Sequence, residues 1–191
     1  MKRALIVSSV VIAILSGAVP GEARDLPASP AGFSWVELTE VRAALLLPSG
    51  WHFRQRGNGD GHTFVYFLSP EPLAAVEHIE AGLTVSVGRK ISEGSGVPAP
   101  AYAEALSAAL SEGEELVDSW TNTSGTLPLF GARIRRAREG QEPVIFQRLA
   151  IGNGTTDTLY LIVFESPESA WQEMWKLGEK MLEQFLLDDT F

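Results

Sequence analysis

Histidine is the side chain in this sequence with the widest chemical use, and the chain has only three: His52, His62 and His78. His52 and His62 flank residues 57–61, a glycine-rich stretch that predicts a turn because glycine and asparagine accept a positive φ. Two imidazoles facing each other across such a hairpin would suit Zn²⁺, which takes nitrogen and oxygen ligands. Their spacing matches no known zinc motif, so exposed strand histidines are the simpler interpretation, and metal binding at His52 and His62 stays open.

Arginine gathers at a second place, where Arg133, Arg135, Arg136 and Arg138 put four guanidinium groups into six residues of an acidic chain. Guanidinium groups favour planar, bidentate pairing with carboxylates and phosphates. The stretch is either a surface that docks an acidic partner or an exposed strand paired with neighbouring glutamates, and charge runs are more often solvated faces. Trp120, among polar neighbours, is a candidate anchor for the same docking surface.

Recognisable catalytic motifs are absent from the sequence. It contains no G-x-S-x-G elbow, no P-loop and no dinucleotide-binding glycine pattern. It also contains no cysteine, which excludes a thiol nucleophile and a cysteine zinc site. We therefore expect a protein that is not an enzyme and that needs no cofactor.

The first 23 residues have the pattern of a secretory signal peptide. Lys2 and Arg3 precede an apolar run over residues 4–19, and small-x-small sites end at Ala18 and Ala23. The run is shorter than the ~20 residues that a spanning helix needs, which favours cleavage over retention as an anchor. We expect a periplasmic or secreted protein, cleaved near Ala18 or Ala23, with no stable membrane insertion afterwards.

The charge balance limits the kinds of partner. The formal net charge is −9, and a net acidic chain argues against nucleic-acid binding, which depends on neutralising phosphates. Residues 24–32, with two prolines and little apolar mass, predict a flexible leader. Residues 33–191 are long enough to form one domain without disulfides.

Period-two alternation of apolar and polar residues predicts most of this domain to be β-sheet. The segment 158–164 is apolar on both faces, which indicates a central strand covered on both sides. The predicted strands are residues 43–47, 51–56, 62–68, 83–87, 116–120, 132–138, 144–151 and 158–165.

Two helices are expected. One covers about residues 101–112, with a single apolar face. The other follows Ser166, a candidate N-cap, with Pro167 at its first position. Trp171 lies on the apolar stripe of this second helix, and Gly178 lies where close packing on the sheet requires a small residue. The prediction is an α+β fold with a single antiparallel sheet of about six to seven strands flanked by helices.

The order of these elements and several of their residues resemble the PsbP-like superfamily, whose fold is shared by the extrinsic PsbP protein of photosystem II and the Ran-binding Mog protein. The residues that carry the resemblance are 47–51, 63–67, 82–87, 160–167 and 185–187. It implies an α/β/α sandwich over about residues 33–188. It also implies action mostly through docking to other proteins, and no shared active site.

The sequence therefore favours an exported, non-enzymatic binding or accessory protein that docks an unknown protein partner. The alternative is a metal-dependent or hydrolytic periplasmic enzyme that uses the His52 and His62 hairpin.

Overall fold

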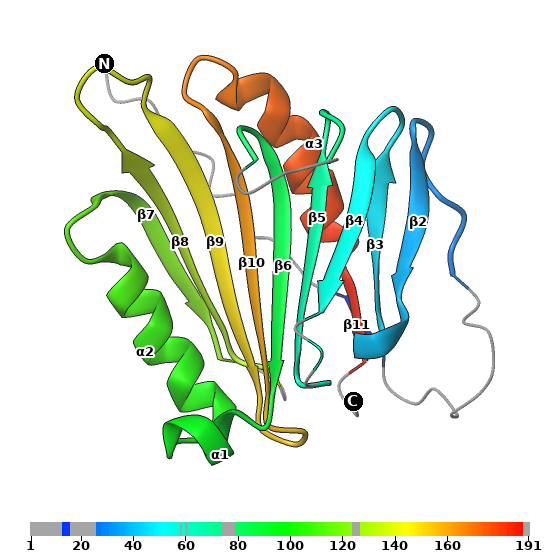
Figure 1. Cartoon of the computed structure of the whole chain (residues 1–191), viewed down its shortest axis with the longest axis vertical. Helices are drawn as coiled ribbons and strands as arrows, with labels where there is room; N and C mark the ends of the chain where they lie inside the picture. Colours follow the sequence, from blue (N-terminus) through cyan, green and yellow to red (C-terminus); the bar gives the residue numbers. More distant parts are fainter. Residues whose placement is uncertain are drawn as a thin grey trace.

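The structure is a computed structural model that describes the backbone of residues 13–15 and, with side chains, most of residues 26–187. Residues 58, 60, 74–78 and 124–126 fall outside the described part, as do residues 1–12, 16–25 and 189–191. Most of the predicted signal peptide and His78 therefore lie outside the described residues. Two β-sheets and three helices make up the described chain (Figure 1).

The large sheet is antiparallel and has seven strands. From one edge to the other they are β4 (His52–Gly57), β5 (Thr63–Ser69), β6 (Gly82–Arg89), β10 (Thr158–Pro167), β9 (Val144–Asn153), β8 (Leu129–Arg136) and β7 (Glu115–Asn122). The predicted α+β class and large antiparallel sheet are confirmed. β10 takes the middle position, as its two apolar faces predicted.

A second, smaller sheet makes the prediction of a single sheet incomplete. Its four strands lie in the order β1 (Ala13–Leu15), β11 (Leu186–Asp188), β3 (Ala43–Pro48) and β2 (Phe33–Leu38), and the 3-10 turn η1 (Thr39–Val41) joins β2 to β3. β3 was expected as a strand, but it pairs with β2 and β11 and not with the large sheet. β1 falls inside the predicted signal peptide and pairs in parallel with β11.

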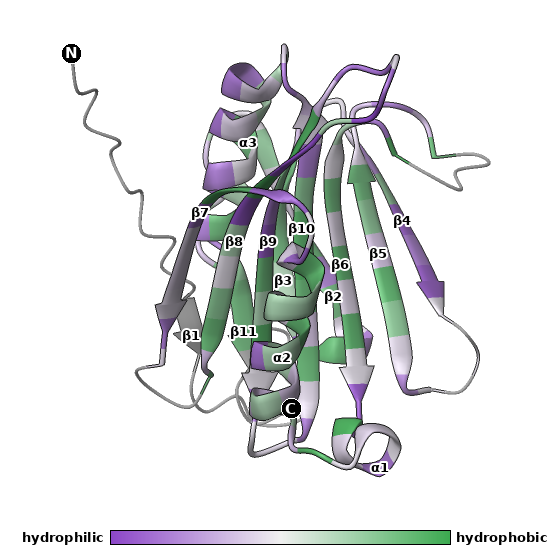
Figure 2. Cartoon of the chain, turned by 90° about the vertical axis from the view of Figure 1, so that its left-hand side faces the viewer, coloured by the Kyte–Doolittle hydropathy of each residue, from purple (hydrophilic) through white to green (hydrophobic). Residues whose placement is uncertain are grey.

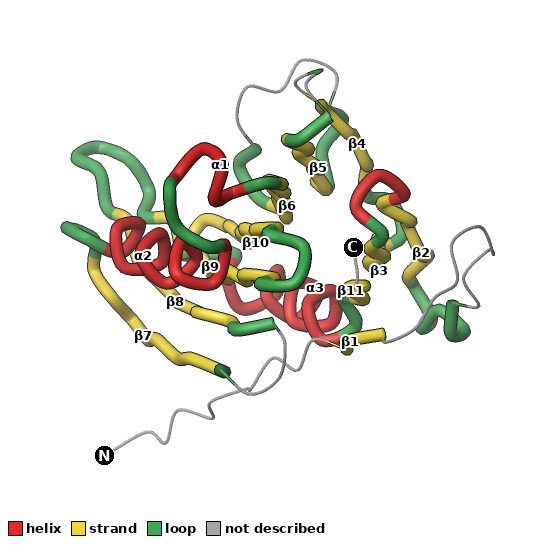
Figure 3. The backbone as a smooth tube through the Cα atoms, turned by 90° about the horizontal axis from the view of Figure 1, so that it is seen from below, coloured by secondary structure: helices red, strands yellow, loops and turns green. Residues whose placement is uncertain are grey.

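The helices lie on opposite sides of the large sheet. α1 (Ile91–Ser95) and α2 (Ala99–Ser111) lie on one side, and α3 (Trp171–Glu183) lies with the small sheet on the other (Figure 3). We call the side toward α3 the inner face and the side toward α2 the outer face. None of the helices in the described part of the chain is long and apolar enough to cross a membrane.

The start of α3 differs from its prediction. Ser166 and Pro167 continue β10 and pair with Ile145 and Val144, and the helix begins at Trp171 without a side-chain cap. The predicted cap is therefore wrong, because these two residues are taken up by the last two pairs of the sheet. Because the helix begins later than predicted, Glu168 lies before it and not in its first turn.

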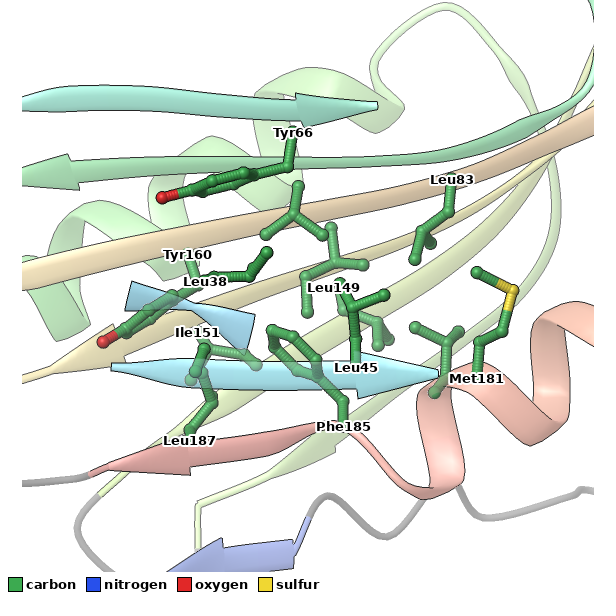
Figure 4. Packing of buried hydrophobic residues seen from close by; sticks show 14 of the residues in the cluster. Leu38, Leu45, Tyr66, Leu83, Leu149, Ile151, Tyr160, Met181, Phe185 and Leu187 are labelled. Carbon is green, nitrogen blue, oxygen red and sulfur yellow. The ribbon is translucent and has the colours of Figure 1, made fainter. Parts of the chain in front are cut away.

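The inner face of the large sheet carries the main core (Figure 4). Leucine, valine, isoleucine and tyrosine side chains from β5, β6, β9 and β10 meet side chains from β3, α3 and the segment that follows it. Gly178 confirms the close approach of α3 to the sheet, because a Cβ there would lie 2.7 Å from the Phe164 ring. Trp171 is half-buried, stacks on Trp175 at 5.2 Å and meets the edge of Phe164 at 5.9 Å.

Candidate docking surface

Three arginines of the stretch fall on β8, the neighbour of edge strand β7. Arg133 and Arg135 share the inner face, and Arg136 lies on the outer face. Arg133 lies on the inner face beneath α3, over the rings of Trp171 at 5.5 Å and Trp175 at 5.0 Å. Its Nε donates to Gln147 Oε1 at 2.8 Å, and burial lowers the pKa of the guanidinium. Arg133 therefore helps to seat α3 on the sheet.

Arg135 is neutralised by two carboxylates. Its Nε and Nη2 donate to the two oxygens of Glu168 at 2.9 and 3.0 Å, and its Nη1 donates to Glu115 at 3.0 Å. The hydrogen bond from Arg135 lowers the pKa of Glu168, and both partners raise the pKa of the guanidinium. The departure of Glu168 from the predicted helix makes this contact possible.

Arg136 and Arg138 complete the stretch. Arg136 lies on the outer face, where its Nε donates to Glu114 at 2.7 Å and its guanidinium lies over the Phe146 ring at 4.8 Å. The hydrogen bond from Arg136 lowers the pKa of Glu114. Arg138 follows the end of β8 and is exposed. Because three of the four guanidinium groups have internal partners, the geometry favours the interpretation of a paired strand.

Trp120 is half-buried on β7 and packs against the inner core. It lies opposite Gly131, and a Cβ at that glycine would come within 2.1 Å of the indole. The ring therefore fills the space that the missing side chain leaves. Its buried Nε1–H has no hydrogen-bond partner among the described residues. Trp120 fixes β7 to the domain more than it presents an open anchor.

The two histidines of the hairpin do not face each other. His52 pairs with Ser69 at the open end, whereas His62 comes one residue before Thr63 at the turn end. They are roughly 17 Å apart along the strands at the usual rise per residue. The expectation that they could meet across the turn is wrong, because β4 and β5 run the full length between them. The described residues hold no group of three histidine or acidic side chains placed to bind a metal ion.

A buried charge cluster occupies the outer face near the end of α2. Arg148 donates to the Leu110 carbonyl near the helix end and lies over Phe146 at 5.2 Å. Burial raises the pKa of Glu165 to about 7, although Arg136 and Arg148 act in the opposite direction. Burial also lowers the pKa of Arg148. The contact between Arg148 and Leu110 joins the end of α2 to β9.

Between α2 and the β7–β8 edge, the outer face is open. A groove of about 450 Å³ lies there, lined by residues that include Glu104, Ser107, Ala108, Leu116, Phe130 and Ala132. Leu116 and its neighbour Val117 are 52% and 46% exposed. Figure 2 shows α2 crossing this face beside β7 and β8. We call this feature the α2–β7 groove.

Trp120, predicted from the sequence as a docking anchor, lines this groove. Sequence reasoning did not predict the groove itself, although a second signal pointed to it. Residues 91–132 contain six acidic residues and no lysine, arginine or histidine. This run includes all of α1, α2 and β7. Glu104 lines the groove, and Glu112 is exposed between α2 and β7. The walls of the groove therefore combine large apolar side chains (Leu116, Trp120 and Phe130) with serine, threonine and Glu104.

Comparison with known proteins identifies the fold. No protein-family model matches the sequence, and no curated protein sequence matches it. Cyanobacterial PsbP from Synechocystis aligns with a TM-score of 0.50 and 14% identity, over 90% of this chain and 98% of that one. LpqN of Mycobacterium tuberculosis, involved in cell envelope biogenesis, aligns with a TM-score of 0.52 and 9% identity, over 82% and 90%.

The Ran-binding protein Mog1p of Saccharomyces cerevisiae aligns with a TM-score of 0.48 and 15% identity, over 83% of this chain and 96% of that one. The chain has a PsbP-like fold, as its resemblance to that superfamily implied. At these identities the likeness concerns the fold alone.

Proposed function

We propose that this protein is an exported binding or accessory protein that docks another protein at the α2–β7 groove and catalyses no reaction. The observation that carries the proposal is the groove of about 450 Å³, with Leu116 exposed at its wall. Large exposed apolar side chains next to a cleft are typical of protein interaction sites. The PsbP-like fold supplies the scaffold that presents the groove.

The surroundings of the groove define the chemistry of the partner. Glu104 lines the groove and Glu112 is exposed between α2 and β7, whereas Glu114 and Glu115 are paired with Arg136 and Arg135. The carboxylates near the groove that can meet a partner are therefore Glu104 and Glu112. Complementary potentials favour the right partner and repel wrong ones. The partner is therefore a protein that presents apolar side chains flanked by lysine or arginine.

The arginine stretch is the weaker candidate for the same role. Arg135 and Arg136 would have to leave Glu168, Glu115 and Glu114 before they could bind an acidic partner. The groove needs no such exchange, because its exposed apolar residues are open to solvent.

Photocrosslinking tests the proposal. A photoreactive amino acid replaces Leu116 in one full-length variant and Val97 in another, and adducts are identified in cells of the source organism. Val97 is the matched control, because it is 41% exposed and precedes the other end of α2. We expect one protein to be trapped from position 116 and not from position 97.

Binding of the purified partner then decides the matter. Leu116→Ser, which removes the apolar contact without adding a charge, is expected to weaken its affinity by about tenfold or more, the size of a contact at the centre of an interface, whereas Val97→Ser leaves it unchanged. Equal affinity of the two variants, or equal trapping from both positions, would overturn the proposal.

A further inference from the structure

The outer edge of β7 is open for backbone pairing. β7 is the last strand of the large sheet and pairs with β8 alone, and no other strand of the described chain pairs with it. An edge strand presents a row of peptide N–H and C=O groups that can accept another strand. The opening lies directly beside the α2–β7 groove.

We infer that the docked partner contributes an extended segment that pairs with β7 as an additional strand. Alternate apolar side chains of this segment enter the α2–β7 groove, and its lysine or arginine side chains meet the surrounding carboxylates. Strand addition is a common mode of peptide recognition, in which the backbone gives affinity and alternate side chains give specificity. The inference rests on the proposed function and names the form of the partner.

The opposite edge of the sheet, strand β4, differs from β7 in its side chains. β4 carries Arg54 and Arg56, both exposed, and Arg54 Nη1 donates to the Leu73 carbonyl at 2.8 Å. Basic side chains are a usual device against edge-to-edge pairing. β7 has no lysine, arginine or proline, and it exposes Leu116 and Val117 instead.

An irregularity in β7 limits where the segment pairs. The register with β8 shifts between Leu116 and Asp118, and from Asp118 to Asn122 it is regular over five consecutive pairs. A bulge disrupts a ladder locally, so the regular part supplies the pairing groups. Leu116 and Val117 lie beyond it and supply apolar contact.

The groove accommodates side chains that come from such a strand. Thr121 and Phe130 form a cross-strand pair that lines the groove, and Leu116 lies along the same wall. The facing wall is α2, whose Ser107 and Ala108 are small. Side chains on one face of a strand repeat every second residue. An added strand therefore projects every second side chain toward α2.

Charge decides against a second copy of this chain as the occupant. Pairing β7 with β7 would bring the Asp118 carboxylates of both copies close together, since β7 has no basic residue. Like charges on neighbouring strands are destabilising. A segment of another protein that carries basic and apolar side chains would be attracted to β7 and not repelled by it.

Synthetic peptides test the mode of binding on the full-length protein. The probe alternates valine with lysine, and the matched control alternates valine with glutamate. We expect the lysine peptide to shift the backbone amide NMR signals of residues 118–122 and to give cross-strand contacts with them. We expect about tenfold or more weakening with Leu116→Ser, none with Val97→Ser, and no binding of the glutamate peptide.

N-methylation separates strand pairing from other contacts. Methyl groups on one alternate set of peptide nitrogens face β7 and abolish binding, whereas methyl groups on the other set face away and leave it intact. If both methylated peptides bind as well as the parent, strand addition is overturned.

The remaining outcomes separate the two proposals. If the crosslinked partner still loses affinity with Leu116→Ser while no peptide pairs with β7, docking stands and only strand addition fails. If Leu116→Ser affects neither partner nor peptide, both fail. Self-association of the wild type that Leu116→Ser abolishes would assign the edge to a second copy and overturn the inference.

Discussion

The two faces of the large sheet differ in how completely they are covered. The inner face lies under α3 and the small sheet, and its side chains join one continuous core from Tyr66 on β5 to Leu129 on β8. The outer face has two smaller apolar clusters, centred on Ala103 and Ile134, with a buried charge cluster and the α2–β7 groove beside them. Among the described helices, α1 and α2 cover it (Figure 3).

This difference separates stability from recognition. The inner face is closed and apolar, so its residues determine whether the chain folds. The outer face keeps charged groups and an open groove, which a fold does not need for its own stability. Substitutions on the two faces are therefore expected to have different effects, and the largest should come from the inner face.

Trp171→Ala is expected to have the largest effect on stability. The change removes a half-buried ring that stacks on Trp175 and covers Arg133. Loss of a large core aromatic costs about 3–5 kcal/mol, and partial exposure places this case near about 3 kcal/mol. Urea unfolding measures the change. A midpoint equal to that of the wild type would show that α3 does not close the inner face.

Glu165→Gln tests the charge cluster of the outer face through pH. Burial raises the pKa of Glu165 from 4.5 to about 7, so between these values the folded state keeps a proton that the unfolded state has lost. The free energy of unfolding therefore falls as pH rises through this window, by up to about 3 kcal/mol. Glu165→Gln should flatten this fall and stabilise the protein at pH values above the window.

Glu168→Gln is the matched control for that experiment. The hydrogen bond from Arg135 lowers the pKa of Glu168, so its contribution to stability is present above the unfolded pKa and is lost as pH falls. The two glutamine variants should therefore change the pH profile in opposite directions. Profiles that change in the same direction would contradict the assignment of Glu165 to a buried site.

Gly131→Ala on β8 and Gly57→Ala on β4 together compare the packing near the two edges of the large sheet. A Cβ at Gly131 would lie 2.1 Å from the Trp120 ring and must displace it, whereas a Cβ at Gly57 on β4 has its nearest neighbour at 4.0 Å. Overpacking costs about 1–3 kcal/mol, so Gly131→Ala should destabilise and Gly57→Ala should not. Thermal unfolding of both variants checks this. Equal melting temperatures would show that Trp120 does not anchor β7.

Arg135→Glu should have a small effect on stability. It replaces two attractive contacts, with Glu168 and Glu115, by repulsion at the surface, and exposed ion pairs contribute little. We expect a slight fall in melting temperature that high salt removes, because salt screens exposed charges. If folding is kept but binding of the crosslinked partner is lost, the arginine stretch and not the groove is the docking surface.

Zinc addition should have the smallest effect of all. His52 and His62 lie at opposite ends of their hairpin, so a single ion cannot bind both. The imidazole NMR signals of the two residues are expected to move independently, or not at all, during a titration with Zn²⁺. Saturable shifts of both at one equivalent of metal would revive the alternative of a metal-dependent enzyme.

The sequence predicted the parts of the fold in which hydrophobic pattern and structure coincide. β10 was recognised as central because both of its faces are apolar, and Gly178 was recognised as a contact point of α3. The small sheet was missed because β11 is only three residues long and β2 lacks a clean alternation. The helix start predicted at Ser166 and Pro167 was wrong because residues that can cap a helix also fit the end of a strand.

The docking surface was harder to predict because it depends on tertiary contacts. The arginine stretch is visible in the sequence, but its partners Glu114, Glu115 and Glu168 are brought to it only by folding. The exposure of Leu116 and Val117 follows from the register shift in β7. This shift cannot be predicted from the order of apolar and polar residues in the strand. Trp120 and the absence of basic residues over 91–132 were the signals available beforehand.

That absence has a kinetic consequence. A molecule with its basic residues outside one continuous acidic region has an uneven electric field, and this field orients an approaching partner before any contact forms. A basic segment would therefore meet α2 and β7 more often than chance collisions allow. Added salt should slow association, while the rate of dissociation, which depends on the apolar and backbone contacts once made, should change little.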